Sequence, residues 1–271
     1  CNYCIEEEQE PLEPIDTLGN LKYNFNRTIG GFGRMVKAQS TKVSWSVFFQ
    51  AIVMIALPIA LQNLLSTTAS MVDTIMIGSE GELAVAAVGI CSQISSLFFS
   101  CYFGFAGGSL LFFSQYYGAK NEQGINKTFG ITFICMFLVA VLFGGMAVLA
   151  PDFILGIYTD KQNIIDIARG YLRIVGFAYP LQVIAVLISF LMRSTERVKP
   201  PLISSIAALI TNFALNWVLI YGRFGFPKMG AAGAAVGTLA SAVVNLILLL
   251  VFLVMMLQHH NHLPGTLYLP V

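Results

Sequence analysis

Length, composition and charge set the class of this protein. Of its 271 residues, 56% are hydrophobic and only 11% are charged, and the mean hydropathy is +0.75, whereas a soluble domain carries roughly 25% charged residues. These values exclude a soluble enzyme and predict an integral membrane protein. The net charge is +1, and no basic cluster exceeds what loops beside a membrane carry, so no nucleic-acid partner is expected.

The apolar residues are grouped in six stretches that are long enough to cross a bilayer as helices, since a spanning helix needs roughly 20 of them. A transmembrane barrel would instead show alternating segments of roughly 10 residues, and residues 243–257 are apolar on every face. The sequence therefore predicts an all-α polytopic membrane protein with six transmembrane helices in contact with the lipid bilayer.

Residues 1–34 differ from everything that follows, because they are acidic, then glycine-rich, and do not begin with Met. We interpret them as a foreign or disordered segment. A short basic stretch with Lys37 and Lys42 then precedes the first apolar run, which is typical of a cytoplasmic N-terminus. That run lacks a small-residue cleavage site, so no cleavable signal peptide is expected. Residues 35–258 are predicted to form the membrane domain, and residues 259–271 a C-terminal tail.

In chain order, we expect transmembrane helices at residues 46–77, 83–118, 128–150, 165–192, 201–221 and 231–257. Three of them exceed a perpendicular span, so they must tilt, kink or protrude. Candidate breaks are Pro58 in the first helix, the glycines around Gly104 in the second and Pro180 in the fourth. Such breaks are tolerated where neighbouring helices or water satisfy the freed backbone groups.

The basic residues of the short loops favour a cytoplasmic N-terminus. With that orientation, the cytoplasmic side holds Lys37, Lys42, Lys120, Lys127, Arg193, Arg197 and Lys199, and the outer side holds Lys161, Arg169, Arg173, Arg223 and Lys228. An even number of helices returns the C-terminus to the cytoplasm. The expected location is the plasma membrane, as the inner membrane of a bacterium.

Asp73 is the one clear acid inside an apolar stretch, and an ionisable group there is a functional candidate because it is expensive to place in lipid. Gln62 and Ser66 recur on nearly the same face of the first helix. One polar stripe therefore follows this helix. The alternative is an acid near a helix end that reaches interfacial water.

The fifth and sixth helices carry matching polar stripes. Asn212 and Asn216 are four residues apart, with Ser205 two turns earlier, and Thr238, Ser241 and Asn245 form the second stripe. Each could be only an interhelical hydrogen-bond partner. Together with Asp73, their oxygens could line a cavity and surround a small hard cation such as Na⁺, or satisfy a protonated carboxyl.

Several other groups are interpreted as structural. The Gly and Ala residues between Gly230 and Gly237 form a surface that favours close helix packing. The isolated C-x-x-C of Cys1 and Cys4 and the three tail histidines near His260 do not have the pattern of a metal site. Apart from a coupling ion, no cofactor or metal is expected.

Several motifs in order resemble the multidrug and toxin extrusion (MATE) transporters. The first helix, IALPIALQNLLSTTASMVDTIMIG, is similar to that family's opening helix, and LAVAAVG follows it. FSQYYGAKNE resembles the end of its second helix, YLRIVGFAYP its fourth, and NFALNWVLIYGRFGFPKMGAAGAAVGT its fifth-to-sixth junction. The resemblance covers roughly residues 43 to 258.

This resemblance implies a fold larger than the chain. MATE transporters have twelve helices in two six-helix lobes, and the match stops after the sixth helix. The expected molecule is the N-terminal lobe of a truncated transporter that lacks its C-terminal lobe, and parallel repeats of this kind hold substrate between the halves. The end, HHNHLPGTLYLPV, does not look like the start of a seventh helix.

The resemblance also implies roles for single residues. Asp73 matches the acidic residue of the first helix implicated in cation coupling, and Pro58 matches the proline at which that helix bends. Asn212 matches an asparagine of the fifth helix, and Thr238 a hydroxyl of the sixth. Asn216 departs from relatives that carry Asp there, so proton coupling in this lobe would depend on Asp73.

The function implied for the complete protein is antiport, in which H⁺ or Na⁺ entering at Asp73 drives export of a cationic or amphipathic drug. A lipid-linked sugar flippase of the same superfamily is an alternative, although such cavities carry more basic residues to meet phosphates. An inactive fragment is another. An intramembrane enzyme is not expected, because no span contains a His and Asp73 has no second acid.

Overall fold

The computed structural model describes residues 45–261, and by internal contacts the chain divides after Ala51 into two units. The arrangement given below is that of the second unit. The predictions for residues 1–34, including the C-x-x-C pair, and for residues 262–271 lie outside the described residues.

Every regular element in the described residues is a helix, which confirms the all-α fold. The elements are α2 (Trp45–Gly78), α3 (Glu82–Gly118), α4 (Glu122–Leu149), α5 (Pro151–Tyr158), α6 (Gln162–Ser194), α7 (Lys199–Tyr221) and α8 (Ala231–Asn261). The helices predicted at residues 46–77, 83–118 and 201–221 are reproduced closely. Those predicted at residues 128–150 and 165–192 begin earlier, and the last continues past residue 258.

The early starts have a local cause. α4 begins at Glu122 because the Asn121 side chain accepts a hydrogen bond from the Gly124 amide at 2.9 Å and so caps the helix. The first turns of α4 contain polar residues, which lie outside the apolar stretch used to predict this helix. The helix begins where backbone hydrogen bonds and the cap allow it to form. The predicted range covered only the apolar residues that lie within the lipid.

The short helix α5 was not predicted. Its eight residues are too few to cross a bilayer, although Pro151 at its first turn and Asp152 beside it are ordinary start signals. Asp152 accepts a hydrogen bond from Arg169 of α6 at 2.6 Å. Phe153 and Ile157 are exposed, as expected of a short helix lying along a membrane surface.

Five helices in the described part of the chain are long and apolar enough to cross a membrane, namely α3, α4, α6, α7 and α8. Their outward residues, such as Leu138 and Ile210, are apolar and exposed, which suits contact with lipid. α2 has 34 residues and continues as one helix through Pro58. Six spans, and a bend at Pro58, therefore stay predictions.

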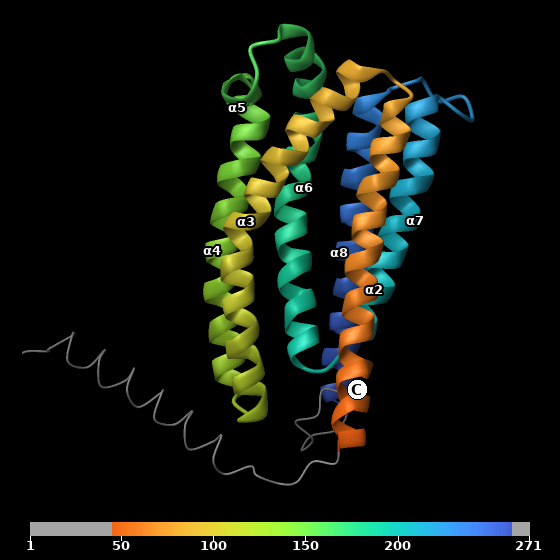
Figure 1. Ribbon diagram of the computed structural model, residues 1–271. Helices are drawn as coiled ribbons and strands as arrows, with labels where there is room; N and C mark the ends of the chain where they lie inside the picture. Colours follow the sequence, from red (N-terminus) through yellow and green to blue (C-terminus); the bar gives the residue numbers. More distant parts are fainter. Residues whose placement is uncertain (1–44, 262–271) are drawn as a thin grey trace, which may run out of the picture. The chain divides into compact units, whose positions relative to one another are not determined.

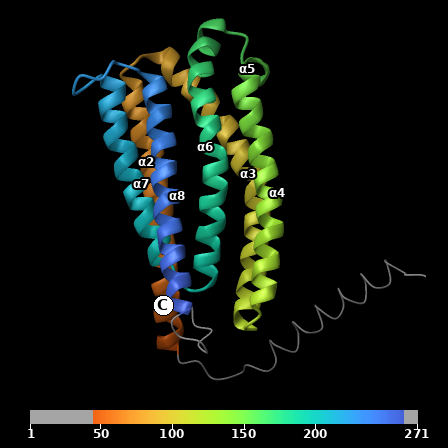
Figure 2. The same ribbon diagram turned by 180° about the vertical axis from the view of Figure 1, so that it is seen from behind.

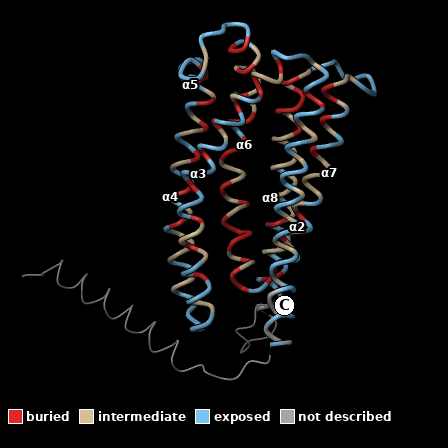
Figure 3. Tube along the Cα trace, viewed as in Figure 1, coloured by how far each residue is buried: buried red, intermediate tan, exposed pale blue. Residues whose placement is uncertain are grey.

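α6 is the central helix of the second unit. In Figures 1 and 2 it lies between the α3–α4 pair and the group of α2, α7 and α8. Figure 3 shows buried residues along nearly its whole length, and the fully buried Leu172, Tyr179 and Leu187 join it to α3 and α4 in the main core cluster. A second contact with α8 buries Ile188 and Leu249.

Glycine permits the closest approach of α4 to α6. A Cβ at Gly144 would lie 2.9 Å from the Gly176 carbonyl oxygen, and one at Gly176 would lie 3.0 Å from the Ala147 Cβ. Small residues are the usual means of helix association in lipid. α6 also continues as one helix through Pro180, which packs beside this crossing.

α2 is anchored mainly near its C-terminal end. Met76 and Ile77 are buried in a cluster with Ile220 of α7 and with Ala231 and Ala234 of α8. Most of the remaining described side chains of α2 are exposed. Ser66 and Asp73 of the polar stripe of α2 face α7 and α8 across a cavity.

Candidate functional site

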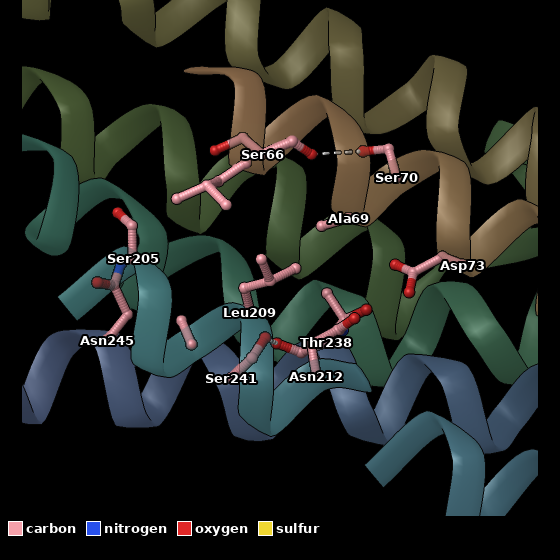
Figure 4. A pocket seen from close by; sticks show the side chains of 12 residues that line it. Ser66, Ala69, Ser70, Asp73, Ser205, Leu209, Asn212, Thr238, Ser241 and Asn245 are labelled. Carbon is pink, nitrogen blue, oxygen red and sulfur yellow. Dashed lines mark hydrogen bonds between the residues drawn. The ribbon is translucent and has the colours of Figure 1, made fainter. Parts of the chain in front are cut away.

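A cavity of about 210 Å³ lies between α2, α7 and α8 (Figure 4). Its lining consists of Leu65, Ser66, Ala69, Ser70, Asp73, Ser205, Ala208, Leu209, Asn212, Thr238, Ser241 and Asn245. Pockets for drug-sized ligands measure about 300–1,000 Å³. This cavity is therefore better suited to a small ion with some water than to a drug.

Helical spacing brings the α2 residues to the cavity. Ser66, Ser70 and Asp73 recur at intervals of three and four residues, so they share one helix face. The Ser70 hydroxyl donates to the Ser66 carbonyl at 3.4 Å, and the Ser66 hydroxyl donates to the Gln62 carbonyl at 3.0 Å. Figure 4 shows Asp73 at one end of the cavity, here called the outer end, and Ser205 with Asn245 at the inner end.

Two amides on α7 connect to Asp73. The Asn216 Nδ2 donates to Asp73 Oδ1 at 2.6 Å and to Asn212 Oδ1 at 3.1 Å. Asn216 is fully buried and Asn212 is 7% exposed. A carboxylate can only accept hydrogen bonds, which fixes the orientation of the Asn216 amide. Asp73, Asn212 and Asn216 are thus joined, as the sequence suggested.

Asn216 itself does not line the cavity. Among the described residues its Oδ1 has no hydrogen-bond partner, and it lies against Gly237 of α8. In this arrangement Asn216 gives Asp73 a hydrogen-bond donor, whereas the sequence suggested only its oxygen, as a ligand for a cation. The neutral oxygens that face the cavity come from other residues.

The contact between α7 and α8 depends on glycine. A Cβ at Gly237 would overlap the Asn216 Oδ1, and a Cβ at Gly233 would lie 2.8 Å from the Leu219 carbonyl carbon. The packing interpretation of this small-residue surface is confirmed. The same contact holds the Asn216 side chain in place behind Asp73.

α8 supplies the opposite wall through Thr238, Ser241 and Asn245. The Thr238 hydroxyl donates to the Ala234 carbonyl at 3.0 Å, and the Ser241 hydroxyl donates to the Thr238 carbonyl at 2.8 Å. Both hydroxyl oxygens keep lone pairs for a further ligand. The buried Asn245 Oδ1 has no donor within the described part of the chain, and a water molecule or cation in the cavity would satisfy it.

Two residues beside this site could not be predicted from the sequence. Tyr171 of α6 packs against the cluster that anchors α2. Arg193 of α6 donates to Gln62. Gln62 does not line the cavity but lies beside Ser205, which does. A tyrosine and an arginine on a separate helix carry no pattern that links them to α2.

A family model described as MatE matches residues 58–218, more than half of the chain. The chain belongs to the MatE family. The matched range contains Asp73, Asn212 and Asn216, and the resemblance inferred from the helix motifs is confirmed. With its apolar helices, this MatE chain is a multi-pass membrane protein.

Curated relatives of this MatE chain are longer than it is. The "Probable multidrug resistance protein YoeA" of Bacillus subtilis is 32% identical over 197 residues, which are 72% of this chain and 42% of that protein. The "Multidrug resistance protein NorM" of Vibrio cholerae is 28% identical, over 75% of this chain and 44% of that protein. The chain spans less than half the length of these relatives.

Solved structures share the fold. One, described as the outward-facing conformation of a multidrug resistance MATE family transporter of the MOP superfamily, matches 75% of this chain and 44% of its own with a TM-score of 0.68 at 20% identity. A MOP superfamily transporter from Pyrococcus furiosus gives the same values. The described helices therefore have the arrangement of one part of a MatE-type transporter.

Proposed function

We propose that this chain forms the N-terminal half of a cation-coupled antiporter that exports drugs or other xenobiotics. In the complete protein, H⁺ or Na⁺ binds at Asp73 and drives export of a cationic or amphipathic small molecule by alternating access. The observation that carries the proposal is the half-buried Asp73 carboxylate, which faces hydroxyl and amide oxygens of α7 and α8 across the cavity.

The geometry supports a hard cation. Asp73 supplies the negative charge, and Asn212, Thr238 and Ser241 supply neutral oxygens from two other helices. Oxygen ligands of this kind suit hard cations. A proton can instead bind Asp73 directly. The protonated carboxyl group still has an oxygen that accepts the hydrogen bond from Asn216.

The names of the relatives support drug export as the transported chemistry. A lipid-linked sugar flippase is less well supported, because the cavity lining contains no Lys or Arg to meet a phosphate. A second six-helix lobe is the proposed partner, and the inner membrane of a bacterium with both termini in the cytoplasm is the proposed location.

The substitution Asp73→Asn tests the proposal. An Asn side chain keeps the size of Asp and can still accept the hydrogen bond from Asn216, but it neither titrates nor carries charge. We expect the purified chain in lipid nanodiscs to lose Na⁺ binding or proton release, measured by calorimetry and by a pH indicator. Asp160→Asn, the same change at an exposed loop residue, is the matched control.

A second measurement concerns transport. Joined to the second lobe of a MatE relative and expressed in an efflux-deficient bacterium, the chain should export a cationic dye. Replacement of Asp73 by Asn should reduce this export to the background level. Unchanged dye export in Asp73→Asn would refute the coupling role. Equal loss in Asp160→Asn would show a defect of folding instead.

A further inference from the structure

A chain of polar contacts lies beyond the inner end of the cavity. Arg193, in the last turn of α6, donates through Nη2 to Gln62 Oε1 of α2 at 2.5 Å. The Gln62 Nε2 in turn donates to the Ser205 Oγ at 2.6 Å and lies 3.4 Å from the Pro201 carbonyl oxygen of α7. Gln62 uses both ends of its amide, so it joins three helices at one point.

This junction is next to the cavity. Ser205 lines the cavity, while Gln62 and Arg193 do not. Figure 4 shows Ser205 at the end remote from Asp73. The Gln62 amide therefore lies directly beside the inner end of the cavity, and the Arg193 guanidinium group lies behind that amide.

The guanidinium group is held in position. Its central carbon lies 5.5 Å from the centre of the Phe190 ring, and Phe190, which is 8% exposed, makes an edge contact with Phe103 of α3 at 6.1 Å between ring centres. The Arg193 Nε is buried without a hydrogen-bond partner in the described part of the chain. No carboxylate among the described residues forms an ion pair with Arg193.

A fixed positive charge in this place repels cations. Arginine stays protonated at every relevant pH, and in a partly buried site its field is screened far less than in bulk water. A positively charged group at a constriction is a known means of excluding cations from a pore. Asp73 attracts a cation at the outer end, and Arg193 opposes its exit at the inner end.

We propose that Arg193, held against α2 by Gln62, is a selectivity residue that closes the inner end of the cavity to cations. The inference rests on the proposed function, because it presumes that cations enter this cavity at Asp73. In this conformation cations exchange only through the outer end. Movement of α2 away from α6 breaks the Gln62 contact and removes the barrier.

The test measures access to the cavity and not transport. In a chain whose five cysteines are replaced by alanine, Ser241→Cys places a thiol on the cavity wall, and Ser66→Cys is a second reporter on the opposite wall. Membrane vesicles of both orientations are treated with a cationic trimethylammonium thiosulfonate reagent and with an anionic sulfonate reagent of similar size. The side on which α6 and α7 are connected is the inner side.

We expect Arg193→Gln to raise the rate of cationic labelling from the inner side by about tenfold, the order of effect of one unit charge in a partly buried site. The rate of anionic labelling should stay unchanged or fall. Arg193→Lys should keep the slow cationic rate, and Arg223→Gln, at the exposed connection between α7 and α8, is the matched control without effect.

Two results would overturn the inference. An equal rise with both reagents would show that Arg193 only holds the helices together, and no rise with either reporter would show that ions do not pass this end. Loss of cation binding at Asp73 is measured separately. The outcome for Arg193 can therefore be read even if the coupling role of Asp73 fails.

Discussion

The substitution Gly237→Ala asks whether the packing of α8 positions the amide that serves Asp73. A Cβ at Gly237 would overlap the Asn216 Oδ1, and the backbone carbonyl oxygen of Asn212 would lie 3.5 Å away. Either α7 and α8 must separate or the Asn216 amide must rotate. Rotation takes the Nδ2 away from Asp73 Oδ1, to which it now donates at 2.6 Å.

Both responses have a known range of cost. Overpacking a tight contact destabilises a fold by about 1–3 kcal/mol, and losing a hydrogen bond to a charged group costs about 1.5–3 kcal/mol. Since one of the two responses is enough to relieve the overlap, we expect the free energy of unfolding to fall by about 1–3 kcal/mol. Gly145→Ala is the matched control, because a Cβ there meets nothing within 4 Å, and it should be neutral or stabilising by up to about 1 kcal/mol.

The free energy of unfolding can be measured by denaturant titration of the purified chain in mixed micelles. The double variant Gly237→Ala with Asn216→Ala removes the overlapping atom, so the two effects should not add. The reasoning is refuted if Gly237→Ala is as stable as Gly145→Ala. It is also refuted if the double variant loses the full sum of the two single effects.

Three further outcomes follow from the helices and their ends. A reporter that is active only outside the cell, fused after Leu257, should be silent, and a strong signal would overturn the even number of spans or the orientation. Lys228→Ala breaks a 3.2 Å ion pair with Glu80 in which the lysine is 61% exposed, so the free energy of unfolding, measured by denaturant titration, should fall by less than about 1 kcal/mol. The chain expressed alone should export no cationic dye above background, because one lobe cannot form both walls of a pathway, and cation-dependent export by it would contradict this unless crosslinking shows paired copies.

The outline of the site could be predicted from the sequence because helical periodicity is a local property. Polar residues in an apolar helix must face something other than lipid, so Asp73, Ser66, Ser205 and Ser241 could be expected on a common interior. The structure places all four around one cavity. Their shared face follows from intervals of three and four residues on each helix.

The partners of these residues could not be predicted, since they depend on how each helix is rotated and where helices cross. Nothing in the spacing of Gln62 indicates that it meets Arg193 of α6 rather than the cavity. The direction of the Asn216 amide depends likewise on Gly237, which belongs to another helix. α5 was not predicted for a different reason, because its eight residues are too few to form a transmembrane helix.

The arrangement around Asp73 relates cation binding to the position of α2. Under the proposed function, a bound cation and the Asn216 Nδ2 share the Asp73 carboxylate, whose two oxygens have lone pairs for both. The cation draws on the same negative charge and so weakens the Asn216 hydrogen bond. That donor and the Gln62 contacts link α2 to α7 and α6. A ligand shifts a conformational equilibrium only by its differential affinity for the two states. Under the proposed function, the difference would arise because a cation at Asp73 weakens a link between α2 and α7, so its binding would favour a conformation in which α2 has moved.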